Sequence, residues 1–580
     1  MAFDTFVLAA VCQELQEKIL GARIIKIHQP DRHTVICKYH QPGDTGRLLL
    51  SANPRRAAVY LSETKQDNPD KAPLFCMVLR KYLEGAKISG IEQIPHDRIL
   101  RISCSYRNDL GDISTCCLII EIMGKHSNII LINQDDLIID GIHRYSHAVS
   151  RHREILPGQP YLAPPAQNKA DPRSLNDEED IADLLLELPL EISISEALAG
   201  CLEGLSPFLA RELVLRADLS PQMPLNYLDS YQFRRLFIAV QEFYRLLDYG
   251  PFQPVLADNK DFAAFPLLSF PKQQQKQFIS MSQALEYFYQ KQREDELFAG
   301  RKRELSKIIT GNLNRMEKKI AIQETDLDKA EAAQAYKKAG DLLSTHLYQL
   351  RDQAKGQDKV VLPDFFQDGK AIEISLDPAK SPEENIKRYY HRYSKAKKAQ
   401  GSIIRQLETN RDELAYLQAV LINTEHAETL ADLLEIKQEL AQSGYLRQDK
   451  KPVSKPEESL PPLSFVSQDG YTILVGRNNR QNDKLTLKIA DKKDIWLHAQ
   501  KIPGSHTIIV SKGQIVPRST INEAASIAAW FSKARGSSKV PVDFTMADQV
   551  KKPNGAKPGM VVYYQQNTVY VTPILPSAGQ

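Results

Sequence analysis

Eight consecutive residues near the C-terminus form the most polar segment of the chain, Gly476-Arg477-Asn478-Asn479-Arg480-Gln481-Asn482-Asp483. We call this segment the polar motif. Guanidinium and amide groups donate the hydrogen bonds with which proteins bind phosphate and sugar oxygens of nucleic acids. Asn482 or Asp483 can also cap the helix expected to follow. The residue types therefore leave two alternatives open, capping alone or capping combined with RNA contact.

A second group of candidate residues comprises Trp496, His498, Gly504, Ser505 and His506. The alternation of a β-strand places Trp496 and His498 on one face. The turn at Gly504 and Ser505 exposes backbone N–H groups, and indole and imidazole rings are surfaces on which nucleobases stack. In the alternative interpretation, the tryptophan belongs to the core and the histidines make local hydrogen bonds.

Lysines gather in a loop close to the C-terminus. Lys551 and Lys552 are separated from Lys557 by a proline and a glycine, which favour an open loop over a helix or strand. We call residues 551–559 the lysine loop. Such a loop can face phosphate groups, and it can equally be a solvated turn.

A further basic cluster lies in a segment with helical spacing. Lys387, Arg388, Arg392 and Lys395 alternate with tyrosines, and the last three share one helix face. This pattern fits rRNA contact, and it also fits an ordinary solvated surface.

Charge is distributed unevenly along the 580 residues, whose net charge is only +3. Residues 461–580 contain 15 Lys or Arg and 7 Asp or Glu, a net charge of +8, so the rest of the chain carries −5. A basic C-terminal module on a mildly acidic body indicates that one domain contacts a polyanion.

Several signatures of enzymes are missing from the sequence. It contains no P-loop, no Rossmann glycine fingerprint, no H-E-x-x-H and no G-x-S-x-G. Its seven cysteines follow no metal-binding spacing and fit buried thiols in a reducing compartment. We therefore expect a non-catalytic protein with no cofactor and no metal.

The sequence shows no sign of export or membrane insertion. Mean hydropathy is −0.38, no apolar run is long enough to span a bilayer, and the N-terminus lacks the pattern of a signal peptide. We expect a cytoplasmic protein without a membrane contact.

The secondary structure expected from the sequence divides the chain into five parts. Residues 1–170 read as a mixed α and β domain that ends in a proline-rich stretch. Residues 171–270 read as helical, and a helix, glycine turn and helix around 200–207 resemble a helix-hairpin-helix, with Ser206 as the helix cap. Residues 446–462 read as a linker, and 463–580 as a small α+β domain.

Residues 271–445 read as a long antiparallel coiled-coil arm with a small insert at 356–380. Apolar residues recur at heptad spacing from Ile309 and again from Ile403. The first helix is expected from Met281 to Ala354. The second is expected to start at Ser381, whose capping box includes Glu384, and to run without a break to Ala441, over about 90 Å.

Taken together, these motifs resemble the NFACT family, and the resemblance covers essentially the whole chain. In the C-terminal domain it rests on the polar motif, on Asp494-Ile495-Trp496-Leu497-His498, on Pro503-Gly504-Ser505-His506 and on the lysine loop. In the N-terminal half it rests on four short segments. They are Ile27-His28-Gln29-Pro30, Leu79-Arg80-Lys81, His96-Asp97-Arg98 and Glu121-Ile122-Met123-Gly124, the last continued by Lys125-His126-Ser127-Asn128.

The resemblance implies a bacterial ribosome quality control factor. Such a factor binds a large (50S) ribosomal subunit obstructed by peptidyl-tRNA, recruits charged tRNA, alanyl-tRNA in bacteria, and directs untemplated C-terminal tailing of the stalled nascent chain. The tail marks the chain for degradation, while the ribosome performs peptidyl transfer. A small S4-domain RNA-binding protein is a further partner implied. The resemblance assigns tRNA contact to Asp97, Arg98, Lys125 and His126, although Asp97 and Arg98 could instead form a surface ion pair.

The resemblance also implies that the N-terminal domain has the fold of formamidopyrimidine-DNA glycosylases. Those enzymes use an N-terminal proline amine as nucleophile, and Met1-Ala2-Phe3 provides none. Two alternative functions remain, a DNA-backbone-binding protein and a fibronectin-binding surface adhesin. The adhesin predicts an export signal or wall anchor, and neither is visible in the sequence.

Overall fold

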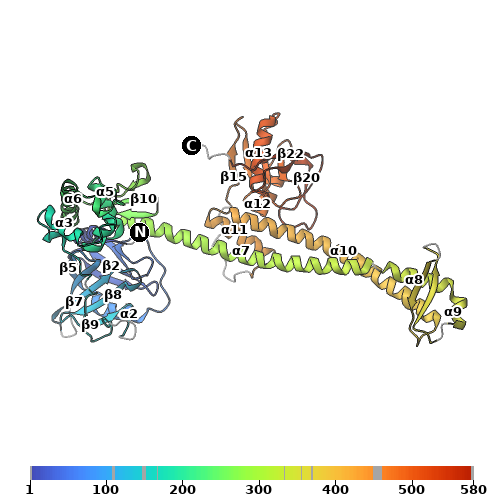
Figure 1. Cartoon of the computed structure of the whole chain (residues 1–580), viewed down its shortest axis with the longest axis horizontal. Helices are drawn as coiled ribbons and strands as arrows, with labels where there is room; N and C mark the ends of the chain where they lie inside the picture. The colour runs from blue at the N-terminus through green and yellow to red at the C-terminus, as the bar shows by residue number, and fades with distance from the viewer. Residues whose placement is uncertain are drawn as a thin grey trace. The chain divides into compact units, whose positions relative to one another are not determined.

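The computed structural model describes residues 3–107, 111–146, 152–165, 167–331, 333–353, 356–366, 370–447 and 460–575. The chain divides into two compact units, Met1–Glu294 and Asp295–Gln580. Both contain helices and strands (Figure 1), so the protein is the mixed α and β multidomain chain that the sequence predicts. Most of the predicted linker, residues 448–459, lies outside the described residues.

The first unit is built around a nine-stranded antiparallel sheet with the order β4-β3-β2-β1-β5-β6-β7-β8-β9. Its strands are β1 Arg23–His28, β2 Thr34–Gln41, β3 Asp44–Ser51, β4 Ala58–Leu61, β5 Lys87–Gln93, β6 Ile99–Arg107, β7 Ile113–Glu121, β8 Asn128–Asn133 and β9 Ile138–Gly141. Isoleucine and leucine at alternating positions put one apolar face of the strands into the core.

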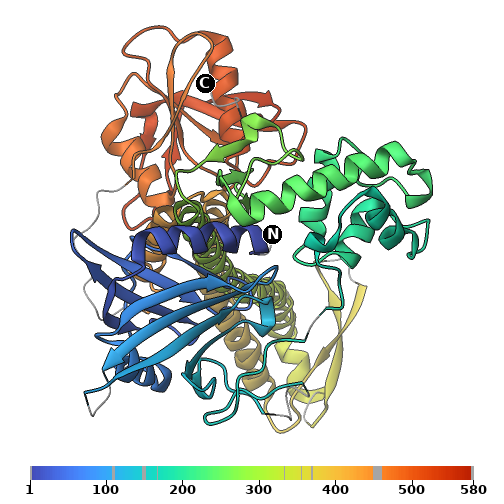
Figure 2. The same ribbon diagram turned by 90° about the vertical axis from the view of Figure 1, so that its left-hand side faces the viewer.

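Two helices pack on this sheet, α1 (Thr5–Ile19) and α2 (Leu74–Leu83). Figure 2 shows α1, in dark blue, beside the strands. Asp4 caps α1 by accepting a hydrogen bond from the Val7 amide at 2.9 Å. Helical spacing then buries Phe6, Val11 and Leu15 against the sheet, and this burial fixes the helix.

The rest of the first unit is largely helical. It contains α3 Glu178–Leu186, α4 Ile194–Cys201, α5 Pro207–Arg216 and α6 Ser230–Tyr249, followed by the short strands β10 Val255–Ala257, β11 Asp261–Ala263 and β12 Gln275–Gln277. The predicted cap at Ser206 is confirmed, because its hydroxyl accepts from the Leu209 amide at 3.2 Å. Pro207 occupies the first position of α5, where its missing N–H costs nothing.

Two long helices form the arm, α7 (Met281–Glu331) and α10 (Pro382–His426). The capping box of Ser381 and Glu384 at the start of α10 is confirmed. The heptad seam is also confirmed, since Ile309, Leu313 and Leu417 are buried between the helices.

Both arm helices end earlier than the sequence predicts. The first stops at Glu331, and the shorter helices α8 (Gln334–Thr345) and α9 (Leu347–Gln353) follow. The second stops at His426, and α11 (Leu430–Gln442) begins at a new capping box formed by Thr429 and Asp432. The expected single helix to Ala441 is therefore wrong. Leu433, Ile436 and Leu440 of α11 pack back against α10, and this burial favours a turn over continuation.

The arm ends in a small α and β tip. The hairpin of β13 (Lys359–Asp364) and β14 (Lys370–Ser375) packs with α8 and the start of α10 around Leu342, Ile374 and Tyr389. The Tyr389 hydroxyl donates to the Ser375 carbonyl at 2.6 Å, which ties the hairpin to α10.

The C-terminal domain contains a six-stranded sheet with the order β15-β16-β18-β17-β19-β22. The strands are β15 Leu463–Val466, β16 Thr472–Val475, β17 Ile495–Ala499, β18 Thr507–Ile509, β19 Val540–Met546 and β22 Asn567–Val571. A separate short pair is formed by β20 Val550–Lys551 and β21 Val562–Tyr563, and the helices are α12 Asn479–Lys484 and α13 Arg518–Trp530. Alanines and isoleucines of α13 bury one face of the sheet.

Candidate RNA-binding surfaces

The four residues assigned to tRNA contact lie together at one end of the large sheet. Asp97 and Arg98 precede β6, while Lys125 and His126 follow β7, its antiparallel neighbour. The Ile122 amide donates to the Arg98 carbonyl at 2.9 Å, which joins the two loops directly. The fold thus brings separate sequence segments into one polar surface.

Local hydrogen bonds shape the Asp97 loop. The Asp97 carboxylate accepts from the Arg98 amide at 2.7 Å, and the Gln93 side chain donates to the Asp97 carbonyl at 2.8 Å. Within the described part of the chain no ion pair joins the Asp97 and Arg98 side chains, which argues against the predicted alternative of a surface salt bridge. Arg98 remains half-buried at the loop surface.

The start of α1 lies within electrostatic range of Arg98. Burial raises the pKa of Asp4 to about 6, against the opposing effects of backbone N–H groups and of the Arg98 charge. The guanidinium is therefore placed beside a desolvated carboxyl group.

Lys125 and His126 are exposed on a single 3₁₀ turn, Gly124–His126. Gly124 has a φ of 57°, a left-handed conformation that glycine adopts without steric cost. The Ser127 hydroxyl accepts from the Met123 amide at 2.8 Å and closes the turn. An exposed cation and imidazole on a fixed turn suit phosphate contact.

A buried ion pair at the end of β7 supports the turn that carries Lys125 and His126. Nη1 and Nη2 of Arg153 each donate to the Glu121 carboxylate at 2.6 Å, and the Tyr161 hydroxyl donates to the same carboxylate at 2.9 Å. Glu121 is fully buried at the end of β7. The family motif at 121–124 thus has an evident structural role, which fixes the base of the turn that carries Lys125.

The helix-hairpin-helix turn packs against other segments of the same unit. The Glu203 amide donates to the Ala170 carbonyl at 3.0 Å. Gly204, with a φ of 75°, packs so closely on His96 that an added β-carbon would lie 3.4 Å from the histidine. These contacts give the turn a packing role and give DNA-backbone binding no support.

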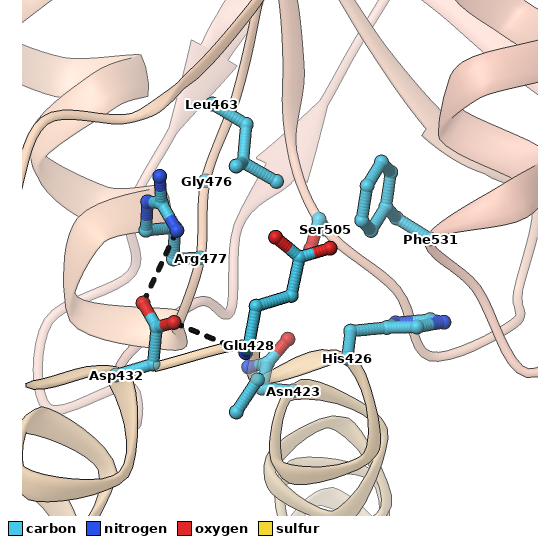
Figure 3. A pocket seen from close by; sticks show the side chains of 10 residues that line it. Asn423, His426, Glu428, Asp432, Leu463, Gly476, Arg477, Ser505 and Phe531 are labelled. Atoms are coloured by element: carbon cyan, nitrogen blue, oxygen red, sulfur yellow. Dashed lines mark hydrogen bonds and ion pairs between the residues drawn. The ribbon is translucent and has the colours of Figure 1, made fainter. Parts of the chain in front are cut away.

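Three residues of the polar motif, Arg477, Asn478 and Asn479, contact α11. Arg477 Nη1 lies 3.2 Å from Asp432 Oδ1, a contact visible in Figure 3. The Asn478 side chain donates to Glu435 at 2.6 Å, and Asn479 donates to Glu439 at 3.1 Å. Within the motif Arg480 is exposed, whereas Asn478 and Asn479 are buried.

Capping in the motif differs from the prediction. Asn478 caps α12 by accepting from the Gln481 amide at 2.8 Å, so Asn482 and Asp483 lie inside the helix. Buried Asn482 accepts instead from the His506 amide at 3.2 Å. The prediction placed the cap too late because an asparagine four residues earlier fills the same role.

A recess lies between the motif and the corner where α10 meets α11. Figure 3 shows Asn423, His426 and Asp432 from the corner facing Arg477 and Ser505 of the C-terminal domain. The space inside is about 20 Å³, enough for about one water molecule and too small for an organic ligand. We interpret the recess as part of an intramolecular joint.

The Trp496 group is an aromatic box in the domain interior. Trp496 is 0% exposed and stacks on His498, with ring centroids 5.7 Å apart, which confirms that the two share a strand face. His506 is 1% exposed, and burial lowers its pKa to about 3. The turn residues Gly504 and Ser505 are buried as well. Trp496 and His506 therefore have no exposed face for stacking in this structure, whereas His498 is half-buried.

The lysine loop is partly tied down. Lys552 pairs with Asp483, and Lys557 lies 3.7 Å from Glu413 and over the rings of Tyr416 and Tyr445. Lys551 is exposed. Two of the three predicted lysines thus help to hold the domain together or against the arm.

Sequence reasoning missed several exposed lysines that follow α12 in the chain. Lys488, Lys492 and Lys493 are exposed, and the Ser511 hydroxyl donates to the Lys493 carbonyl at 2.9 Å, which brings Lys512 beside them. The spacing of four residues between Lys488 and Lys492 was a usable signal, but the sequence analysis favoured the neighbouring polar motif because it contains more kinds of hydrogen-bond donor.

The basic cluster of α10 lies at the arm tip. Lys387, Arg392 and Lys395 are exposed, whereas Arg388 is half-buried and 3.4 Å from Asp377. The described residues include no group of three or more His, Cys, Asp or Glu placed to hold a metal. Nor does the described chain include a helix long and apolar enough to cross a membrane.

Comparison with known proteins gives a match over almost the whole chain. The family model for the NFACT N-terminal and middle domains matches residues 4–459, and that for the NFACT protein RNA binding domain matches residues 462–565. The Rqc2 homolog RqcH of Bacillus subtilis is 36% identical over 577 residues, which cover 99% of this chain and 98% of that protein.

Two further similarities cover parts of the chain. The ribosome quality control complex subunit NEMF of Mus musculus is 28% identical over 138 residues, or 24% of this chain and 12% of that protein. The solved N-terminal part of the fibronectin/fibrinogen-binding protein from Streptococcus suis is 32% identical, with a TM-score of 0.43, and covers 50% of this chain and 100% of that one. The glycosylase-like fold of the N-terminal domain stays a prediction.

Proposed function

The chain belongs to the NFACT family of ribosome quality control proteins, and from this premise we propose that it binds large ribosomal subunits obstructed by peptidyl-tRNA. There it recruits charged tRNA, tRNA-Ala in the first instance, and directs untemplated tailing of the stalled chain. The family resemblance seen in the sequence is confirmed by the comparisons.

The observation that carries the proposal is the polar surface where β6 begins and β7 ends. It combines an arginine, a lysine and an imidazole within two loops joined by a backbone hydrogen bond. Arg98 and Lys125 supply the phosphate or base contacts of a tRNA, and Asp97 fixes the loop that presents Arg98.

Two other surfaces supply subunit affinity. The exposed lysines 488, 492, 493 and 512 give the C-terminal domain a phosphate-facing surface. Lys387, Arg392 and Lys395 provide a second basic contact at the arm tip. Binding to rRNA through two linked patches gives a higher affinity than either patch alone, provided that both can engage together.

The protein acts in this proposal as a cytoplasmic, non-catalytic factor. Peptide bonds form in the ribosomal peptidyl transferase centre, and the factor contributes binding and orientation. A small S4-domain RNA-binding protein is a proposed partner in the tailing cycle. The adhesin and DNA-binding alternatives gain no added support from the contacts described above.

A reconstituted tailing reaction tests the proposal. Obstructed subunits carrying a labelled peptidyl-tRNA are incubated with the full chain, charged tRNA-Ala and elongation factors, and the labelled chain is followed by gel mobility. We expect a ladder of alanine extensions that requires the protein. The absence of extension, with subunits that still react with puromycin, would refute the proposal.

A further inference from the structure

Three side chains of the polar motif, whose donors suit a nucleic-acid backbone, are already paired with carboxylates of the same chain. Three consecutive residues of the motif meet three carboxylates on one helix. These contacts are Arg477 to Asp432, Asn478 to Glu435 and Asn479 to Glu439. The carboxylates occupy positions i, i+3 and i+7 of α11, which lie on one helix face.

The carboxylate face of α11 resembles a nucleic-acid strand in its charge. With a rise of about 1.5 Å per residue, the three carboxylates form a row of negative charges roughly 5 Å apart. A nucleic-acid strand likewise presents a regular row of negative charges with acceptor oxygens. Arginine and asparagine donors satisfy either partner with similar geometry.

We propose that the carboxylate face of α11, formed by Asp432, Glu435 and Glu439, is an internal competitor of RNA. While the C-terminal domain is docked on α11, the face occupies the donors of Arg477, Asn478 and Asn479. When the domain is released, the same donors bind the phosphate and sugar oxygens of RNA. This inference rests on the proposed RNA-binding function and adds an autoinhibitory contact to it.

The contact between the polar motif and α11 desolvates Glu439, and this unfavourable effect makes release of the C-terminal domain feasible. Glu439 is 1% exposed, and its burial raises the pKa of the carboxyl group despite hydrogen bonds from Asn479 and Tyr416. Desolvation of a carboxylate offsets part of the free energy that its hydrogen bonds contribute. A solvated phosphate backbone can therefore compete with it.

The segment that leads into the domain is held by the same contact. The Leu460 amide donates to Glu435 at 3.0 Å, and Arg477 Nε donates to the Pro461 carbonyl at 2.9 Å. Loss of Glu435 thus loosens both the motif and the entry to the domain. Hydrogen exchange of residues 460–483 consequently reports docking.

The test removes two of the three carboxylates, Glu435 and Glu439, from the full-length protein. Glu435→Ala with Glu439→Ala should raise hydrogen exchange at 460–483. It should also tighten binding of a fluorescein-labelled single-stranded RNA about tenfold, because up to three charged-group hydrogen bonds become available. Adding Arg477→Ala and Asn479→Ala to this variant should return the affinity to the wild-type level. Glu435→Gln, which keeps the shape of the side chain, should give a smaller increase.

A matched control separates docking from charge. Glu408→Ala with Glu425→Ala removes the same charge from exposed positions of α10 and should leave affinity unchanged within about twofold. Unchanged RNA affinity or unchanged exchange in the Glu435 and Glu439 variant would overturn the inference, as would equal tightening in the control. If neither the wild type nor any variant binds RNA, the proposed function fails instead.

Discussion

At the scale of single residues, the buried Glu121 and Arg153 pair has the largest expected effect on stability. Removing one partner leaves an unpaired buried charge, which costs about 3–5 kcal/mol. We expect Glu121→Ala to lose that much stability in denaturant unfolding followed by circular dichroism. Glu92→Ala is the control, because the Glu92 side chain that contacts Arg101 is 66% exposed and its removal should cost less than about 1 kcal/mol. Equal losses in the two variants would contradict the role of Glu121.

Arg98 is the residue on which tRNA recruitment most depends in this account. Arg98→Ala should lower tRNA affinity by about tenfold or more and abolish tailing, since one charged contact contributes about 1.5–3 kcal/mol. Subunit binding should remain. Arg107→Ala, at the other end of β6, is the matched control and should change neither property. Tailing at the wild-type rate in Arg98→Ala would remove this residue from the site.

His506 makes the stability of the C-terminal domain depend on pH. Burial lowers its pKa to about 3, while an unfolded histidine binds a proton near 6.5. The stabilising effect is complete above pH 6.5 and is lost as the pH falls toward 3, at up to about 1.4 kcal/mol per pH unit.

The variant His506→Gln isolates this effect. Trp496 and Trp530, the only tryptophans of the chain, both lie in this domain, so their fluorescence follows its unfolding. The variant should be less stable at pH 7.5 and show a shallower decline between pH 6.5 and 4. A decline of equal slope in both proteins would show that His506 does not titrate as described.

At the scale of helices and strands, local patterns predicted the arm and its caps. Ser206, Ser381 and the heptad seam depend on neighbours within a few residues, so spacing alone identified them. The turn at Thr429 was missed because it depends on apolar residues of α11 packing back on α10. Polarity and charge cannot indicate whether a partner is RNA or another helix, so the docked polar motif was also missed.

The candidate tRNA surface likewise depends on contacts between distant segments, which the sequence could not predict. The family resemblance named its four residues, but the sequence shows no link between the loops at 97–98 and 125–126. That link arises only from the pairing of β6 with β7. The support by Glu121, Arg153 and Tyr161 likewise joins residues far apart in the chain.

The basic face at the arm tip gives a prediction for a whole helix. Lys387→Glu, Arg392→Glu and Lys395→Glu together should weaken binding to the large subunit and reduce its dependence on salt, because fewer counterions are released. Arg388 is left unchanged because of its contact with Asp377. Arg315→Glu with Lys318→Glu on α7 serves as the control. An unaltered salt slope in the tip variant would exclude this face from rRNA contact.

At the scale of the whole molecule, the proposed surfaces divide the work among separate parts. The first unit carries the proposed tRNA surface, while the arm tip and the C-terminal domain carry the basic surfaces proposed to contact rRNA. This arrangement accounts for the net charge of +8 on the C-terminal segment of a nearly neutral chain. It also fits a protein that binds several RNAs and leaves the chemistry to the ribosome.

The most direct test of this account is to identify the RNA bound to the protein in cells. The tagged full-length chain is purified after crosslinking, and its RNA is sequenced alongside that of Asp97→Ala with Arg98→Ala. We predict enrichment of large-subunit rRNA and one tRNA species, with little small-subunit rRNA, and loss of the tRNA alone in the variant. Recovery of no RNA, or of both subunit rRNAs in equal amounts without tRNA, would contradict the account.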